Sequence, residues 1–142
     1  MNSDLAREMA QLTLEHLALV LVSMAAAIAI AVPAGILITR RAVWRPWVMG
    51  FANVMQTIPS LALFGFLIPV PLIGGIGKRT AIVALVLYAL LPILRNTLVG
   101  ILGVDPAVRE SAVAMGMTGG QLLWQVEMPL AARTILAGIR VA

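Results

Sequence analysis

Six carboxylates and one histidine are the side chains in this 142-residue sequence that could perform acid–base chemistry or hold a metal. The acids all lie outside the long apolar segments, and they are Asp4, Glu8, Glu15, Asp105, Glu110 and Glu127. His16 is the only histidine and there is no cysteine, which excludes thiol catalysis and disulfides and removes most metal sites and Ser-His relays. The segment GGIGKRT (74–80) lacks the spacing of a phosphate-binding loop. We therefore expect no catalytic residue, no metal and no cofactor held by this chain.

The polar stretch RESAVAMGMTGGQLLWQVEMP, residues 109–129, interrupts the apolar sequence and carries signals for short helices. Just before it, Asp105 is followed by proline, which is a typical helix start with an N-cap oxygen and proline in the first turn. Residues 107–115 should then be helical, and Gly116 can stop that helix in the left-handed conformation. The pattern predicts a short helix that ends in a tight turn.

A second short helix is predicted to follow this turn. Thr118 can serve as its N-cap, with Gln121 three residues later as the partner in a capping box. Pro129 is expected to end this helix and to turn the chain back into the membrane. Residues 105–129 therefore form a predicted helix–glycine–helix hairpin. From the capping signals alone, an amphipathic connector without further function is an equally good interpretation.

The elements that must position this hairpin are membrane spans. The chain is 61% hydrophobic and 11% charged, with a mean hydropathy of +1.02, which is typical of a membrane protein. Uncharged or nearly uncharged apolar stretches cover residues 17–38, 48–70, 80–101 and 130–142. The fourth is too short to cross about 30 Å of hydrocarbon, so we expect its helix to be cut off. The sequence thus predicts an all-α membrane protein, with a flank at 1–16 and one transmembrane domain at 17–142.

The distribution of positive charge predicts the orientation of these spans. Arginines flank the hairpin and fill the first connection, at positions 40, 41, 45, 109 and 133. Counting crossings places both connections on the same side of the membrane, whereas Lys78 and Arg79 fall on the other side. The positive-inside rule then predicts a cytoplasmic hairpin and an N-terminus outside the cell.

Polar side chains recur along the predicted second span, broadly on one helical side. They are Asn53, Gln56, Thr57 and Ser60. Such a face can line a translocation path or form hydrogen bonds with neighbouring helices, and both interpretations stay open. Pro59 is expected to kink this span.

The hairpin also matches a known family pattern. Glu110-Ser111-Ala112, then Gly116, then Val126-x-Met128-Pro129 resembles the EAA loop of binding-protein-dependent ABC importer permeases, with every gap of the pattern preserved. Three further segments resemble the permeases of glycine betaine, carnitine and choline importers: NVMQTIPSLALFGFLIP (53–69), YALLPILRNT (88–97) and ILAGIRVA (135–142). The resemblance implies the MetI-like helix bundle of type I importers, incomplete in its fourth span.

The resemblance implies a function for the hairpin and a set of partners. The hairpin would couple the permease to a separate cytoplasmic ATPase, which binds and hydrolyses ATP, through Glu110, Ser111, Ala112, Gly116, Val126, Met128 and Pro129. The other partners would be an extracytoplasmic solute-binding protein, a second permease subunit and the lipid of a bacterial cytoplasmic membrane, with no role for nucleic acid.

Quaternary-amine osmoprotectants are the substrate class that the resemblance implies, although no aromatic cage for them is visible in the sequence. Import of another solute by the same class of transporter, such as an amino acid or methionine, is the alternative. An ATP-independent channel or a scaffold subunit is a third interpretation.

Overall fold

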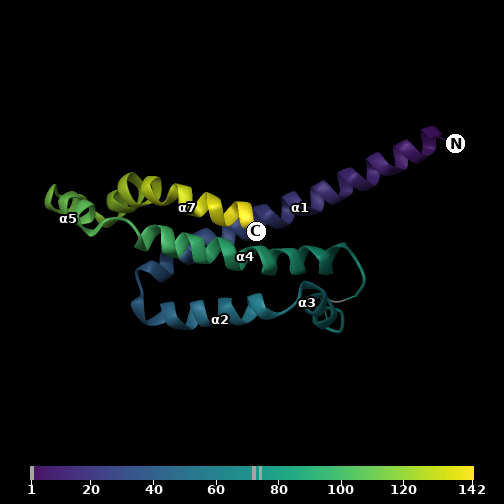
Figure 1. Cartoon of the computed structure of the whole chain (residues 1–142), viewed down its shortest axis with the longest axis horizontal. Helices are drawn as coiled ribbons and strands as arrows, with labels where there is room; N and C mark the ends of the chain where they lie inside the picture. Colours follow the sequence, from purple (N-terminus) through teal and green to yellow (C-terminus); the bar gives the residue numbers. More distant parts are fainter. Residues whose placement is uncertain (1, 72, 74) are drawn as a thin grey trace.

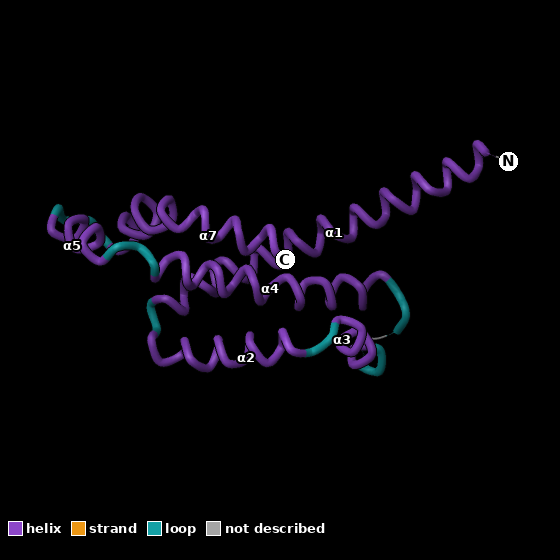
Figure 2. Tube along the Cα trace, in the orientation of Figure 1, coloured by secondary structure: helices purple, strands orange, loops and turns teal. Residues whose placement is uncertain are grey.

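The computed structural model describes residues 2–71, 73 and 75–142, and the side chains of residues 2, 3 and 56 lie outside this description. Within the described part every regular element is a helix (Figure 2). The helices are α1 (Asn2–Thr39), α2 (Arg45–Thr57), α3 (Ser60–Leu67), α4 (Lys78–Leu102), α5 (Pro106–Ala114), α6 (Gly119–Gln121) and α7 (Met128–Val141). A 3-10 turn at Ala42–Trp44 precedes α2, and a π-helical turn at Leu122–Glu127 joins α6 to α7. The predicted all-α fold is confirmed.

Helices α1 and α4 are long and apolar enough to cross a membrane, and they correspond to the predicted spans 17–38 and 80–101. Helix α1 begins much earlier than predicted, so residues 2–16 of the flank continue the span as one helix. The reason is local, since residues 2–16 contain no glycine or proline and are rich in good helix formers. The N-terminal half of α1 projects beyond the other helices (Figure 1).

The second predicted span, 48–70, is two helices in the structure and not one. Helices α2 and α3 are bent by 97° at the break between them. Pro59 disfavours the helical conformation of the residue before it, and Ile58 is accordingly extended, with φ −79° and ψ 122°. The predicted kink at Pro59 is therefore a complete break of the helix.

The bundle is centred on α4, which packs against both α1 and α7 (Figure 1). Glycines make both contacts close. A Cβ atom on Gly35 of α1 would lie 2.8 Å from Thr97, and one on Gly138 of α7 would lie 2.6 Å from the Cβ of Asn96. Small residues allow helix backbones to approach in this way, and dispersion between tightly packed helices is a main source of stability in lipid.

Two connections that are far apart in sequence lie at the same end of the bundle (Figure 1). One is the arginine-containing turn between α1 and α2, and the other is the segment from α5 to the start of α7. An ion pair between Arg40 and Glu127 joins them. The two connections therefore share one end of the bundle, and the α3–α4 connection lies at the opposite end. The side of the membrane on which they lie stays a prediction.

Candidate functional site: the hairpin between α4 and α7

The first helix of the hairpin, α5, begins and ends through the predicted caps. The side chain of Asp105 accepts a hydrogen bond from the backbone N–H of Ala107 at 2.9 Å, with Pro106 in the first turn. At the other end Gly116 has φ +84°, and its N–H donates to the carbonyl of Val113 at 2.9 Å. The N–H of Met117 donates to the carbonyl of Ala112 at 3.2 Å, which completes a Schellman motif.

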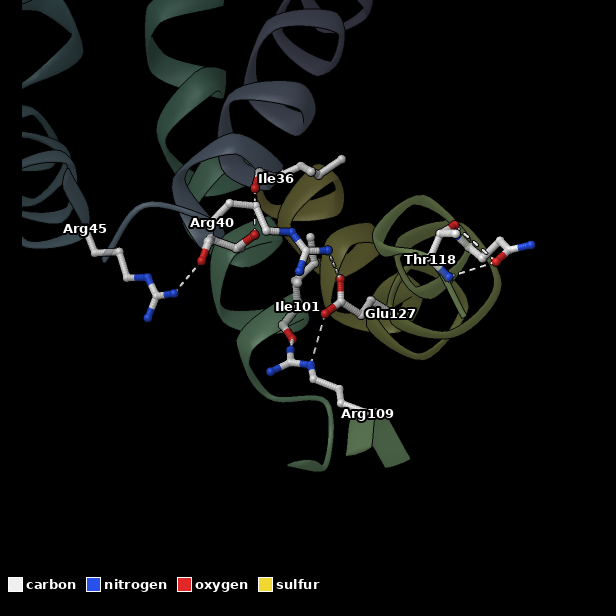
Figure 3. Close-up of polar contacts among 9 residues, drawn as sticks. Ile36, Arg40, Arg45, Ile101, Arg109, Thr118 and Glu127 are labelled. Carbon is white, nitrogen blue, oxygen red and sulfur yellow. Dashed lines mark hydrogen bonds and ion pairs between the residues drawn. The ribbon is translucent and has the colours of Figure 1, made fainter. Parts of the chain in front are cut away.

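The second helix of the hairpin opens with the predicted capping box. The N–H of Thr118 donates to Oε1 of Gln121 at 2.8 Å, and the N–H of Gln121 donates to Oγ1 of Thr118 at 3.4 Å. These bonds satisfy two donors that a helix N-terminus otherwise leaves unpaired. Figure 3 shows this cap beside the ion pairs of Glu127. The position and chemistry of this helix start are confirmed.

The prediction that Pro129 ends this helix is wrong. The chain continues as a helix through the π-helical turn at Leu122–Glu127 into α7, where Pro129 occupies the first turn. In the π turn the N–H of Met128 donates to the carbonyl of Leu123, five residues earlier. A wider turn directly before the proline relieves the clash that its ring makes with the preceding carbonyls in a regular helix. The second half of the hairpin therefore continues into α7 without a break in the helix.

The predicted coupling residues lie on both faces of the hairpin. Glu110, Ser111, Gly116 and Pro129 are exposed, Val126 and Met128 are half-buried, and Ala112 is buried. Two large apolar side chains accompany the exposed ones, since Met115 is 73% exposed and Trp124 is 66% exposed. The hairpin thus presents an acidic group and pliable apolar side chains to its surroundings, and it buries the small Ala112 against its second half.

A buried acid on this hairpin was not predicted from the sequence. Glu127 is 1% exposed, and its two carboxylate oxygens face two arginines from other elements (Figure 3). Oε2 accepts a hydrogen bond from Arg40 at 2.5 Å, and Oε1 lies 3.0 Å from Nε of Arg109 in an ion pair without hydrogen-bond alignment. The helical spacing of Glu127 with buried Ala131 and Ile135 was the available signal, because it places the acid on the packed face of α7.

Two arginines at this end also hold the last carbonyls of long helices. Arg109 donates to the carbonyl of Ile101 near the end of α4, and Arg45 donates to the carbonyl of Thr39 at the end of α1. Carbonyls at helix C-termini lack partners within the helix and carry partial negative charge. The positive residues therefore complete helix ends here, in addition to any role in membrane orientation.

The predicted polar face of the second span is divided by the break at Pro59. Asn53 and Thr57 are exposed residues of α2, whereas Ser60 is the first residue of α3 and so belongs to another helix. The hydroxyl of Thr57 donates to the carbonyl of Val54 at 2.6 Å within its own helix. The side chain of Gln56 lies outside the described residues. These residues do not form one continuous helical face, and their role in translocation stays a prediction.

Among the described residues, no three His, Asp or Glu side chains lie close enough together to hold a metal ion. The hairpin is the feature that the geometry marks out. Residues 27–142, which include all of it, match the family described as "Binding-protein-dependent transport system inner membrane component". The chain belongs to this family. The resemblance inferred from the EAA spacing is thereby confirmed at the level of the family and its MetI-like fold.

Proteins similar to this inner membrane component are named as transport permeases. The chain is 48% identical over 130 residues to the carnitine transport permease protein OpuCB of Listeria monocytogenes, covering 92% of the chain and 58% of the relative. It is 48% identical over 126 residues to the glycine betaine/carnitine/choline transport system permease protein OpuCB of Bacillus subtilis, covering 89% and 57%. It is 46% identical over 141 residues to the osmoprotectant import permease protein OsmW of Salmonella typhimurium, covering 98% and 66%. The chain spans little more than half the length of the first two relatives.

Proposed function

We propose that this inner membrane component is the permease subunit of a binding-protein-dependent ABC importer for quaternary-amine osmoprotectants. In this proposal a separate ATPase binds and hydrolyses ATP on the cytoplasmic side. The hairpin at 105–129 fits into that ATPase and transmits its movement to the spans. A solute-binding protein delivers the substrate from outside, and a second permease subunit completes the pathway.

The observation that carries the coupling role is the construction of the hairpin. Its two halves are capped by side chains and joined by a left-handed glycine, so it keeps a defined shape while it projects from the bundle. Its exposed surface offers Glu110 for a charged contact, and Met115 and Trp124 for apolar contact. Methionine suits a surface that shifts during a cycle, because its side chain adapts to different partners. The continuous helix into α7 gives a stiff route from the hairpin to the membrane.

The orientation follows from the distribution of charge at the two ends of the bundle. Arg40, Arg41, Arg45 and Arg109 all belong to the end that carries the hairpin, whereas Lys78 and Arg79 belong to the other. This excess supports a cytoplasmic hairpin and an external N-terminus. Among the described residues, two helices are long and apolar enough to cross a membrane, or up to three if α2 and α3 together form a broken span.

The substrate class is supported by the names of the relatives, which mention carnitine, choline, glycine betaine or osmoprotectants. The sequence shows no aromatic cage of the kind that binds quaternary ammonium groups. We therefore assign selectivity to the solute-binding protein, and we assign to this chain the passage and its coupling to ATP.

Uptake measurements test the proposal. Cells that carry this chain as part of its complete permease, with the neighbouring ATPase and binding protein, should accumulate labelled glycine betaine under salt stress. Unlabelled choline and carnitine should compete, whereas methionine should not. Competition by methionine alone would assign the importer to another substrate. Uptake that persists when the ATPase gene is deleted would contradict ATP coupling.

A further inference from the structure

Glu127 joins the hairpin to the residue that follows α1, and it also pairs with an arginine that is bonded to the end of α4. Its carboxylate contacts Arg40, the residue directly after α1, although the two lie 87 positions apart in the sequence. It also pairs with Arg109 of α5. Since each carboxylate oxygen faces a different arginine, both ion pairs exist at the same time (Figure 3). We call Arg40, Arg109 and Glu127 the arginine–glutamate clamp.

Each arginine of the clamp also lies at the C-terminal end of a long helix. Arg109 donates to the carbonyl of Ile101 near the end of α4. Arg40 follows Thr39, whose carbonyl is held by Arg45. The positive groups are thus favourably placed at helix C-termini, and the carboxylate of Glu127 links both of them to the segment that leads into α7.

The burial of Glu127 makes its contacts with the two arginines costly to break. Val32 and Ile36 of α1 pack against the apolar cluster that contains Ala131 and Ile135 of α7. Apolar packing of this kind is not directional. A carboxylate that is 1% exposed cannot move away from its partners without leaving a buried charge unpaired, which is strongly unfavourable. The clamp therefore fixes the position of the hairpin relative to α1 more tightly than packing alone.

We propose that Glu127 is a positioning residue whose ion pairs make the hairpin, the end of α1 and the end of α4 move as one body. This inference rests on the proposed coupling function of the hairpin. In it, a displacement imposed on the hairpin by the ATPase reaches α1 through Arg40, in addition to α7 through the continuous helix. Loss of the clamp leaves ATPase docking intact and disconnects α1 from it.

A mutant cycle on the assembled transporter separates this role from a purely structural one. Glu127→Gln, Arg40→Gln and the double variant are compared in proteoliposomes for ATPase association, ATP hydrolysis and uptake. We expect association to be kept and the uptake per ATP hydrolysed to fall about tenfold, a coupling energy within the range known for residues between two sites. The double variant should equal Glu127→Gln, because Arg40→Gln removes only an ion pair that Glu127→Gln already removes. Arg41→Gln is the matched control, since the Arg41 side chain forms no hydrogen bond or ion pair with the described residues.

Uptake and ATP hydrolysis are divided by the amount of folded, ATPase-bound permease, so that a loss of stability alone does not change the result. If Glu127→Gln lowers that amount, Arg40→Gln tests the same pair at a side chain that is 46% exposed. Normal association with an unchanged ratio of uptake to hydrolysis would overturn this inference and leave the proposed function intact. Absence of ATPase association in the unaltered protein would overturn both.

Distances between spin labels test the single-body movement directly. The chain has no cysteine, so cysteines placed at Leu37 and Trp124, both well exposed, can be labelled selectively. Their distance distribution should be the same with and without ATP in the unaltered background, and it should differ between the two states in Glu127→Gln. A distance that changes with ATP in the unaltered background would overturn the inference.

Discussion

The hairpin at 105–129 and the broken helix pair α2–α3 are both interrupted helical segments, yet their interruptions have different origins. In the hairpin, side-chain caps from Asp105, Thr118 and Gln121 and the positive φ of Gly116 determine where each helix begins and ends. Between α2 and α3, Pro59 removes a donor and excludes the helical conformation of Ile58, but it provides no cap. The hairpin is therefore defined by bonds within itself, whereas the geometry of the α2–α3 break also depends on its neighbours.

A contact from α4 illustrates this dependence. The hydroxyl of Tyr88 donates to the carbonyl of Ile58 at 3.1 Å, so a residue from another helix binds a backbone group that the break leaves free. The comparison suggests that the hairpin keeps its shape when its surroundings change, as a coupling element must. The 97° bend, in contrast, should respond to changes in packing.

The largest effect is expected from Gly116→Val. Its φ of +84° is unfavourable for a residue with a Cβ, by about 1–2 kcal/mol, and more for a β-branched one. No atom lies within 4 Å of a Cβ placed there, so only the backbone conformation is affected. We expect ATPase association and uptake to fall together by about tenfold, in line with this energy.

Two controls accompany this variant. Gly116→Asn should retain most activity, because asparagine tolerates the left-handed conformation better than other residues. Gly120→Val should also be mild, since Gly120 lies in open space without a positive φ. Equal activity of Gly116→Val and Gly116→Asn would contradict the account of the turn.

A smaller effect is expected from Thr118→Ala, which removes one half of the capping box. Loss of an N-cap costs about 1 kcal/mol, so amide exchange at residues 119–121 should accelerate about fivefold. Thr13→Ala is the matched control, because the Thr13 hydroxyl bonds to the carbonyl of Met9 within the regular helix α1. Unchanged exchange in Thr118→Ala would show that contacts outside the hairpin hold this helix start.

The smallest functional effect is expected from Pro59→Ala, which tests the other side of the comparison. Alanine restores the N–H donor and frees Ile58 to become helical, so the bend should decrease. Spin labels at positions 50 and 66 should then move apart toward about 24 Å, the length of a straight helix over this interval. A bend that stays unchanged would show that packing and the Tyr88 contact alone set it.

Sequence reasoning succeeded where structure depends on neighbours in the chain. The caps at Asp105 and Thr118 and the glycine stop at 116 were predicted, because each needs only residues within a few positions. The two long spans were found from their apolar length. The family pattern added the position of the hairpin within a known fold.

Other features depend on partners that are distant in sequence or on how strain is relieved. Pro129 was expected to end a helix, but the preceding π turn accommodates it. The burial of Glu127 was not predicted, because its partner Arg40 lies 87 positions away in the sequence and only the folded chain brings the two together. The size of the bend at Pro59 is likewise a matter of packing against α4, which no local rule specifies.

The sidedness of the hairpin is the central claim, and cysteine accessibility measures it most directly. Single cysteines at Met115 in the hairpin and at Ile76 in the opposite connection are both well exposed in a chain that has no other cysteine. In spheroplasts, a membrane-impermeant maleimide should label the cysteine at 76 and should reach the one at 115 only after the membrane is opened. Labelling of position 115 from outside the intact membrane would contradict the account, because no cytoplasmic ATPase could then bind the hairpin.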